Sequence, residues 1–291
     1  RRQRQMCIRD STYTETENDL TVKANKRTFI FSKKDGQLKG VSVDNRKISF
    51  ANGPRFIGAR RADRSLDQFY NHDDEKAKEK DRTYSEFPDA AVFTKLDVKQ
   101  DGGDLVVTAN YKLGNLDKAQ WTINPSGDLA LDYTYNFSGV VDLMGIRFDY
   151  PEDQVISKRW LGAGPYRVWQ NRIHGTQYDV WENDYNDPIP GETFTYPEFK
   201  GYFGDVSWMN IQTKEGTISL TNETPDAYIG VYQPRDGRDR LLYTLPESGI
   251  SVLNVIPPVR NKVNSTDLCG PSSQPKWVNG PQTGRVIFRF M

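Results

Sequence analysis

The chain has 291 residues, and its 39 lysine and arginine residues equal its 39 aspartate and glutamate residues in number, so the formal net charge at pH 7 is zero. A balanced charge argues against nucleic-acid binding over a large surface and against electrostatic docking to an anionic membrane, because both need a basic excess. No apolar run reaches the roughly 18 residues of a transmembrane helix, and 27% charged and 12% aromatic residues are typical of a folded globular protein.

The first eleven residues differ in character from the rest of the chain. Four arginines fall within the first nine positions, and no apolar stretch follows them. This pattern does not match a secretory signal, which needs an apolar central region. We expect residues 1–11 to be a tail that is either non-native or disordered, and residues 12–291 to form a single domain.

Short β-prone runs separated by turns then recur along the chain. Alternation of apolar and polar residues is clearest in residues 129–137, and the turn at residues 34–36 predicts a hairpin between two of the runs. Turn residues between runs favour antiparallel sheets. The expected strands are 21–24, 28–31, 38–43, 105–111, 129–137, 206–211, 217–220, 252–256 and 285–290.

Helical patterns are scarce, and the alternation of strands with helices that marks parallel α/β folds is absent. Residues 160–202 break the strand rhythm, because they are rich in glycine, proline, asparagine and aromatic residues. We expect this region to form long ordered loops over a sheet. The sequence therefore predicts an all-β fold, a large antiparallel sandwich of two sheets.

Two motifs carry a resemblance to a known family. Residues 159–172, RWLGAGPYRVWQNR, resemble the segment W-x-G-x-G-P-x-E-x-Y-x-D-R of the C-terminal domain of family 2 β-galactosidases. Residues 196–208, YPEFKGYFGDVSW, are similar to a second motif of that domain, and order and spacing agree over about residues 20–291. The resemblance implies a galactose-mutarotase-like β-supersandwich, in which the motif residues with structural roles are Trp160, Gly162, Gly164, Pro165, Gly201, Asp205 and Trp208.

The sequence departs from the family pattern at several positions. Arg167, Trp169 and Asn171 stand where the family has glutamate, tyrosine and aspartate, whereas Arg172 is kept. A counterpart of the family's late active-site tryptophan is not found. The resemblance therefore does not imply galactose specificity.

The resemblance implies an accessory, carbohydrate-associated domain of a β-galactosidase-like glycoside hydrolase. Enzymes of that family cleave with two glutamates on a separate TIM barrel, about 5–5.5 Å apart in a retaining enzyme. That barrel is absent from this sequence, so we expect no catalytic residues in the chain. The expected partners are an oligo- or polysaccharide and the catalytic domains of the parent enzyme, at a periplasmic or extracellular location.

A cluster of aromatic residues within positions 160–208 suggests where a sugar could bind. The C–H face of a sugar ring packs on aromatic planes, and its hydroxyl groups need polar partners. We expect a stacking role for Trp169 or Trp181, hydroxyl contacts from Asn171 and Glu198, and a carboxylate partner for Arg172, either Glu198 or a uronic acid. The predicted carbohydrate-binding residues are thus Trp169, Asn171, Arg172, Trp181 and Glu198.

Other interpretations stay open. The aromatic residues are also what long loops need as anchors, which favours a purely structural interaction domain. A mutarotase-like epimerase or polysaccharide lyase on the same fold would need a general acid and base, for which His72 and His174 are available. No cofactor is expected, and a calcium or sodium ion near Asp184 and Asp187 is the minority interpretation of an oxygen-rich turn.

Overall fold

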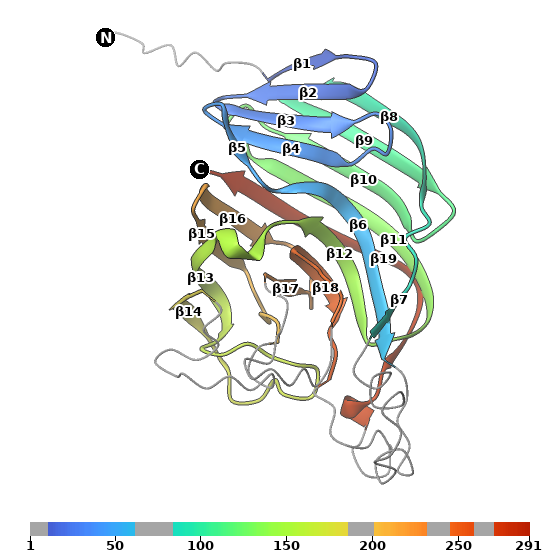
Figure 1. Cartoon of the computed structure of the whole chain (residues 1–291), viewed down its shortest axis with the longest axis vertical. Helices are drawn as coiled ribbons and strands as arrows, with labels where there is room; N and C mark the ends of the chain where they lie inside the picture. Colours follow the sequence, from blue (N-terminus) through green and yellow to red (C-terminus); the bar gives the residue numbers. More distant parts are fainter. Residues whose placement is uncertain (1–10, 62–83, 186–200, 232–244, 259–270) are drawn as a thin grey trace.

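A computed structural model describes residues 11–61, 84–185, 201–231, 245–258 and 271–291. These residues form two antiparallel sheets that face each other (Figure 1). Helical structure in the described residues comprises two short 3-10 helices, η1 (Glu152–Gln154) and η3 (Pro271–Ser273). No helix among them is long and apolar enough to cross a membrane. The all-β, two-sheet prediction is confirmed.

The first sheet has ten strands and contains the beginning of the chain. Strand β5 pairs only with β4, and β7 only with β6. In spatial order the strands are β1 (Thr12–Glu15), β2 (Asp19–Ala24), β3 (Arg27–Ser32), β4 (Leu38–Val43), β6 (Ala51–Arg61), β12 (Leu143–Asp149), β18 (Ile250–Val255) and β17 (Tyr228–Gly230), with β5 (Arg46–Ile48) and β7 (Tyr84–Glu86) off this path.

The second sheet has nine strands and contains the end of the chain. Its two longest strands, β11 and β19, pair along their length from Leu129 opposite Phe288 to Val141 opposite Lys276. In spatial order the strands are β14 (Gln177–Asp184), β13 (Val155–Gly164), β15 (Trp208–Thr213), β16 (Gly216–Asn222), β19 (Lys276–Phe290), β11 (Leu129–Val141), β10 (Leu116–Ile123), β9 (Asp104–Lys112) and β8 (Val92–Asp101).

The predicted strands coincide with β2, β3, β4, β9, β11, β15, β16, β18 and β19, and the hairpin at residues 34–36 joins β3 to β4 as expected. The expectation of loops throughout residues 160–202 is wrong in part. Residues 160–164 end β13, and β14 is a strand within this region, paired with β13 from Ser157–Asp184 to Gly164–Gln177. Strand β14 is an exposed edge strand and lacks the alternation of a half-buried strand.

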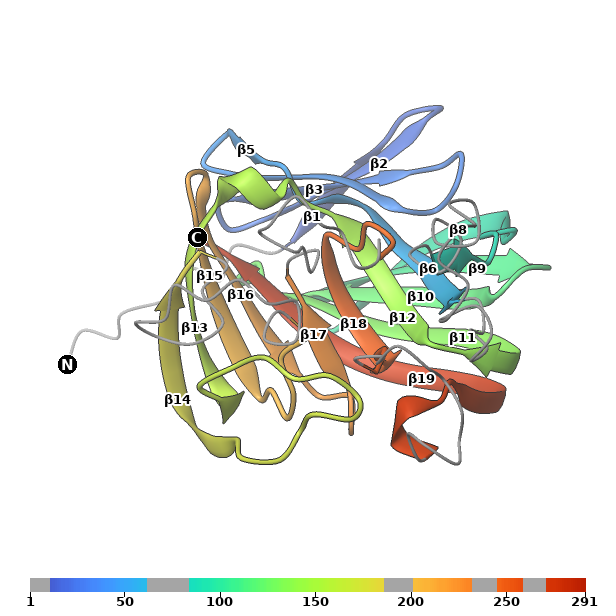
Figure 2. The same cartoon turned by 60° about the horizontal axis from the view of Figure 1, so that its bottom comes forward.

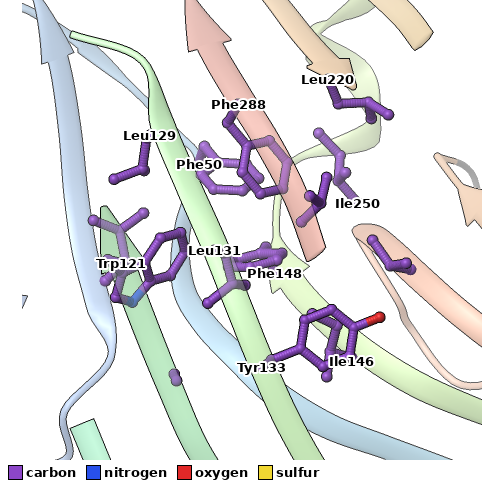
Figure 3. Packing of buried hydrophobic residues seen from close by; sticks show 14 of the residues in the cluster. Phe50, Trp121, Leu129, Leu131, Tyr133, Ile146, Phe148, Leu220, Ile250 and Phe288 are labelled. Carbon is purple, nitrogen blue, oxygen red and sulfur yellow. The ribbon is translucent and has the colours of Figure 1, made fainter. Parts of the chain in front are cut away.

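A large aromatic core fills the space between the sheets (Figure 3). Phe148 of β12 lies at its centre, with its ring centroid 4.7 Å from that of Phe50 and 5.4 Å from that of Phe288 on the facing sheet. Trp121 of β10 contacts Phe148 edge-on, and Leu131 is fully buried beside them. Burial of such side chains, worth roughly 1.5–3 kcal/mol each, stabilises the sandwich.

The outer face of the ten-stranded sheet carries a second hydrophobic cluster. Adjacent residues of a strand point to opposite faces, so Ile57 and Ala59 face outward while Phe56 points into the inter-sheet core. Leu143 of β12 and Leu253 of β18 extend the outward apolar surface. Val168 and Trp169 of the connection between β13 and β14 cover this cluster, together with Tyr202.

Candidate functional site

The connection between β13 and β14 contains most of the predicted site residues. It leaves the edge of the nine-stranded sheet at Gly164 and returns to it at Gln177. Figure 2 shows it as a yellow-green trace that reaches from β14 toward β17 and β18 of the other sheet. Its contact with that sheet is fixed by the amide of Gln170, which donates to the carbonyl of Pro257 at 3.1 Å.

Glycines at the end of β13 permit close packing there. A Cβ atom at Gly164 would lie 2.3 Å from Cδ1 of Trp181, so the indole ring of Trp181 rests directly on the glycine. A Cβ atom at Gly162 would lie 2.9 Å from the carbonyl oxygen of Gly204. A side chain at either glycine would therefore need its neighbours to shift, and the structural role that the resemblance implies for these glycines stays a prediction.

Trp169 lies in the connection between β13 and β14 and is completely buried. Val168 and Tyr202 exchange backbone hydrogen bonds of 2.7 and 2.8 Å, and the Trp169 ring meets that of Tyr202 edge-on at 5.8 Å between centroids. A Cβ atom at Gly201 would lie 1.9 Å from the Val168 carbonyl oxygen, so only glycine fits beside this bridge. Trp169 and Tyr202 thus belong to the second hydrophobic cluster. Burial raises the pKa of the Tyr202 hydroxyl above its usual value.

Asn171 and Arg172 follow in a tight turn. The amide of Arg172 donates to the carbonyl of Trp169 at 3.0 Å, and the side-chain amide of Asn171 donates to the Ser273 hydroxyl at 3.2 Å. The side-chain amide of Gln170 donates to the carbonyl of Gln274 at 3.2 Å. These bonds hold the turn against η3 and Gln274, the residue that follows it, and Arg172 is exposed.

Two buried cations lie near Phe203, just after Tyr202. Nζ of Lys158 is 6.0 Å and the guanidinium carbon of Arg167 is 5.6 Å from the Phe203 ring centroid. Lys158 also donates to the backbone carbonyl of Asp184. Arg167 stands where the family motif has glutamate, and it is 3% exposed. Neither buried cation was expected from the sequence, because each approaches Phe203, which lies far along the chain.

The remaining motif residues are distributed over the sheet edge. Trp160 of β13 is fully buried, with its ring 4.9 Å from that of Phe203, and its indole nitrogen donates to the carbonyl of Ala163 at 3.0 Å. Trp208 at the start of β15 is half-buried, and Asp205 is exposed with φ of 49°. Pro165 follows a cis peptide bond.

The predicted contact residues occupy different environments. Trp169 has no exposed surface, so in this structure it offers no face to a sugar, and its expected stacking role does not fit. Trp181 is half-buried, with its indole nitrogen donating to the Gln177 carbonyl at 3.1 Å. Asn171 is half-buried and Arg172 exposed, and carbohydrate contact by these residues stays a prediction. Glu198 lies outside the described residues, as does any pairing of Arg172 with it.

The candidates for metal and acid–base chemistry stay equally open. Asp184 is exposed, whereas Asp187 and His72 lie outside the described residues. Within the described part of the chain, no group of three or more His, Cys, Asp or Glu side chains could hold a metal ion. His174 is exposed in the connection, and its backbone carbonyl accepts a hydrogen bond of 3.5 Å from the Tyr166 hydroxyl.

Comparison with known proteins gives one family match. Residues 23–260 match the model of the family described as beta galactosidase small chain. No curated protein matches the sequence. Among solved structures, a galactose 1-epimerase from Lactobacillus acidophilus is 8% identical with a TM-score of 0.47, over 97% of this chain and 98% of that one. An aldose epimerase homologue from C. elegans is 7% identical with a TM-score of 0.44, over 97% of this chain and 99% of that one.

Proposed function

Because the chain belongs to the beta galactosidase small chain family, we propose that it is a C-terminal accessory, carbohydrate-associated domain of a family 2 glycoside hydrolase. The match over residues 23–260 carries this proposal, since it includes the strands from β3 to β18, which belong to both sheets, and the whole connection between β13 and β14. The two carboxylates that a retaining glycosidase needs, about 5–5.5 Å apart, belong in this proposal to the catalytic barrel of the parent enzyme.

The geometry of the connection supports a role in presenting polar groups to a sugar. The turn from Trp169 to Arg172 is anchored by backbone hydrogen bonds and by the Asn171–Ser273 contact, so its side chains are held in place before any ligand arrives. Such preorganisation reduces the entropy that binding must overcome. With Trp169 buried beneath the turn, Trp181 is the aromatic residue of the predicted set that keeps exposed surface.

The proposed partners are an oligo- or polysaccharide and the catalytic domains of the parent enzyme, at a periplasmic or extracellular location. A domain that contacts a substrate held mainly by a barrel needs little affinity of its own. We therefore expect the isolated chain to bind sugars near the millimolar level, which corresponds to about −4 kcal/mol.

The first experiment tests for catalysis. Purified chain is incubated with aryl galactosides, glucosides and glucuronides, and mutarotation of galactose is followed by polarimetry in parallel. We expect neither hydrolysis nor mutarotation above the uncatalysed rates. Hydrolysis that a point substitution abolishes would overturn the accessory role, and mutarotation lost in His174→Gln would favour the epimerase alternative.

The second experiment tests sugar contact through the indole N–H signals of the six tryptophans. Galactose, rhamnose and galacturonate oligomers are titrated into labelled protein, and we expect the Trp181 signal to shift. Trp121 is fully buried between the sheets and provides an internal control that should not move. Absence of any shift at Trp181, Asn171 and Arg172 with every sugar would leave a structural interaction domain.

A further inference from the structure

A cavity lies on the outer face of the ten-stranded sheet, at the end remote from the connection between β13 and β14. Its volume is about 710 Å³, and its lining includes Lys47 of β5 and Glu152 at the start of η1. This volume falls within the range of roughly 300–1,000 Å³ that is typical of ligand sites. The lining is mainly polar, which is unsuited to an apolar ligand.

Two arginines line the cavity side by side. Arg55 of β6 lies directly opposite Arg147 in the antiparallel pairing with β12. Both point outward, because their strand neighbours Phe56, Ile146 and Phe148 belong to the inter-sheet core. Side chains directly opposite each other start from Cβ atoms about 4.5–5.5 Å apart, and like charges at such positions are destabilising. An arrangement of this kind needs negative charge from elsewhere.

The positive charges of the two arginines have different hydrogen-bonding partners beside the cavity. Arg55 forms an ion pair with Asp149, whose second oxygen accepts a hydrogen bond of 2.9 Å from the Asn52 side chain. Arg147, in contrast, forms no ion pair within the described part of the chain, and its Nη1 donates to the neutral backbone carbonyl of Glu247. The Arg55 guanidinium is therefore ion-paired with a carboxylate, whereas the hydrogen bond of the Arg147 guanidinium goes to a neutral carbonyl.

Donor groups on both guanidiniums remain unused. The Nε atoms of Arg55 and Arg147 are buried and have no acceptor among the described residues. Buried donors without acceptors cost roughly 1–3 kcal/mol each. A planar anion placed between the two guanidiniums, after a small reorientation of either one, would supply the acceptors that these groups lack.

The other charges around the cavity do not fill this role. Lys39 on the lining is paired with Asp19 at 2.9 Å. The carboxylate of Asp89 interacts electrostatically with both arginines but accepts hydrogen bonds from the backbone amides of Ala91 and Phe56. Burial raises the pKa of Asp89, although the backbone amides and the two arginines act to lower it. Lys47, Glu152 and Glu247 line the cavity as further charged groups.

We propose that this arginine cavity, defined by Arg55, Arg147, Asn52, Ser49 and Lys47, binds the carboxylate group of an acidic sugar such as a hexuronate residue. The fork of a guanidinium matches the two oxygens of a carboxylate, which favours bidentate pairing with Arg147. The Ser49 hydroxyl donates to Glu215 and the Asn52 side-chain nitrogen to Asp149, so the oxygens of these two side chains provide acceptors for ring hydroxyls. Lys47 adds positive charge at the exposed rim. The carboxylate part rests on the cavity alone, whereas the sugar part rests on the proposed function.

Titration with small ligands tests the proposal. Galacturonate, glucuronate, galactose, acetate and inorganic phosphate are titrated separately into the full chain, and binding is followed by NMR. We expect both uronates to shift signals of Arg55, Arg147 and their strand neighbours, with a dissociation constant in the millimolar range. Galactose should leave these signals unchanged.

Three variants connect binding to the cavity. Arg147→Met keeps the apolar stem and should weaken uronate binding at least tenfold, and Lys47→Gln, at an exposed position, should weaken it a few-fold without disturbing the fold. Arg285→Met, on the other sheet and paired there with Asp132 and Glu223, is the matched control and should leave binding unchanged.

Each contrary result has a distinct meaning. Uronate binding that survives both Arg147→Met and Lys47→Gln, or no uronate binding at all, would overturn the proposal. Equal binding of acetate or phosphate would overturn the assignment to an acidic sugar and indicate a general anion site. Shifts at Trp181 that persist in Arg147→Met would support the proposed function independently of this cavity.

Discussion

The two ends of the outer face of the ten-stranded sheet are built from the same strands and differ completely in character. At one end, Ile57 and Ala59 of β6 lie beneath Trp169 and Tyr202 and form a second hydrophobic cluster. At the other end, only a few residues away along β6, Arg55 faces outward beside Arg147 and lines an open cavity. On the inner face, Phe56 of β6 and Ile146 and Phe148 of β12 belong to the inter-sheet core.

The covered end contributes buried apolar side chains that stabilise the fold, whereas the open end keeps charged side chains available for binding. At the covered end, a long connection buries large aromatic side chains, and Gly201 beside it lets two backbone segments approach closely. The open end places two like charges opposite each other, an arrangement that is destabilising by itself. We therefore expect substitutions at the covered end to change stability and those at the open end to change binding.

The largest expected effect is that of Trp169→Ala. Removal of a fully buried indole should lower the free energy of unfolding by about 3–5 kcal/mol, because a cavity is left above β6, β12 and β18. Urea unfolding followed by tryptophan fluorescence measures the change. Trp277→Ala is the control, since that side chain is 71% exposed and should cost no more than about 0.5 kcal/mol. Equal effects of the two substitutions would refute the buried position of Trp169.

Gly201→Ala should have the next largest effect. The new methyl group would lie 1.9 Å from the Val168 carbonyl oxygen, so the bridge between Val168 and Tyr202 must shift, at a cost of about 1–3 kcal/mol. Gly40→Ala is a matched control, because its methyl group would have its nearest contact 3.9 Å away, at Cδ1 of Ile30. Urea unfolding of both variants measures the difference, and no loss in Gly201→Ala would contradict the close approach.

The sandwich was predictable from sequence because its strands carry local signals. Alternation in residues 129–137 and the turn at residues 34–36 are properties of neighbouring residues, and they identify β11 and the β3–β4 hairpin correctly. Strand β14 gives no such signal, since it lies at a sheet edge and most of its residues are exposed. Its pairing with β13 places Trp181 on Gly164, a contact that composition alone does not indicate.

The candidate site was less predictable because it depends on contacts between distant parts of the chain. Trp169 resembles a sugar-stacking residue in sequence, yet the bridge from Val168 to Tyr202 turns it inward. The arginine cavity could not be predicted from the sequence for the same reason. Arg55 and Arg147 become neighbours only when β6 pairs with β12, and each alone is an ordinary arginine in a strand.

On the nine-stranded sheet, Arg289 is an arginine whose charge is paired with a carboxylate. Asp128 accepts two hydrogen bonds from Arg289, at 2.7 and 2.8 Å, and these bonds lower the pKa of the Asp128 carboxyl below its usual value of 3.8. Asp128→Asn should therefore cost about 0.5–1 kcal/mol at neutral pH.

The effect of Asp128→Asn should also depend on pH in a defined direction. A lowered pKa in the folded state means that the carboxylate stabilises the protein above its unfolded-state pKa, and that this stabilisation is lost as the pH falls through the folded-state value. The gap between wild type and variant, measured by urea unfolding over a pH series, should narrow below about pH 4. Asp97→Asn, which removes a more exposed carboxylate, is the control, and a gap that widens toward acid pH would contradict the pairing.

Arg147→Met should have the smallest effect on stability. The substitution removes the hydrogen bond to the Glu247 carbonyl, but it also removes a charge that lies opposite Arg55 and forms no ion pair within the described part of the chain. Because these contributions oppose each other, the free energy of unfolding should change by less than about 1 kcal/mol in either direction. Arg285→Met, which leaves Asp132 and Glu223 without their partner, should be destabilising by up to about 1 kcal/mol. If Arg147→Met unfolds the protein while Arg285→Met does not, Arg147 is a structural residue, and the open end of the sheet is a part of the folded core rather than a binding site.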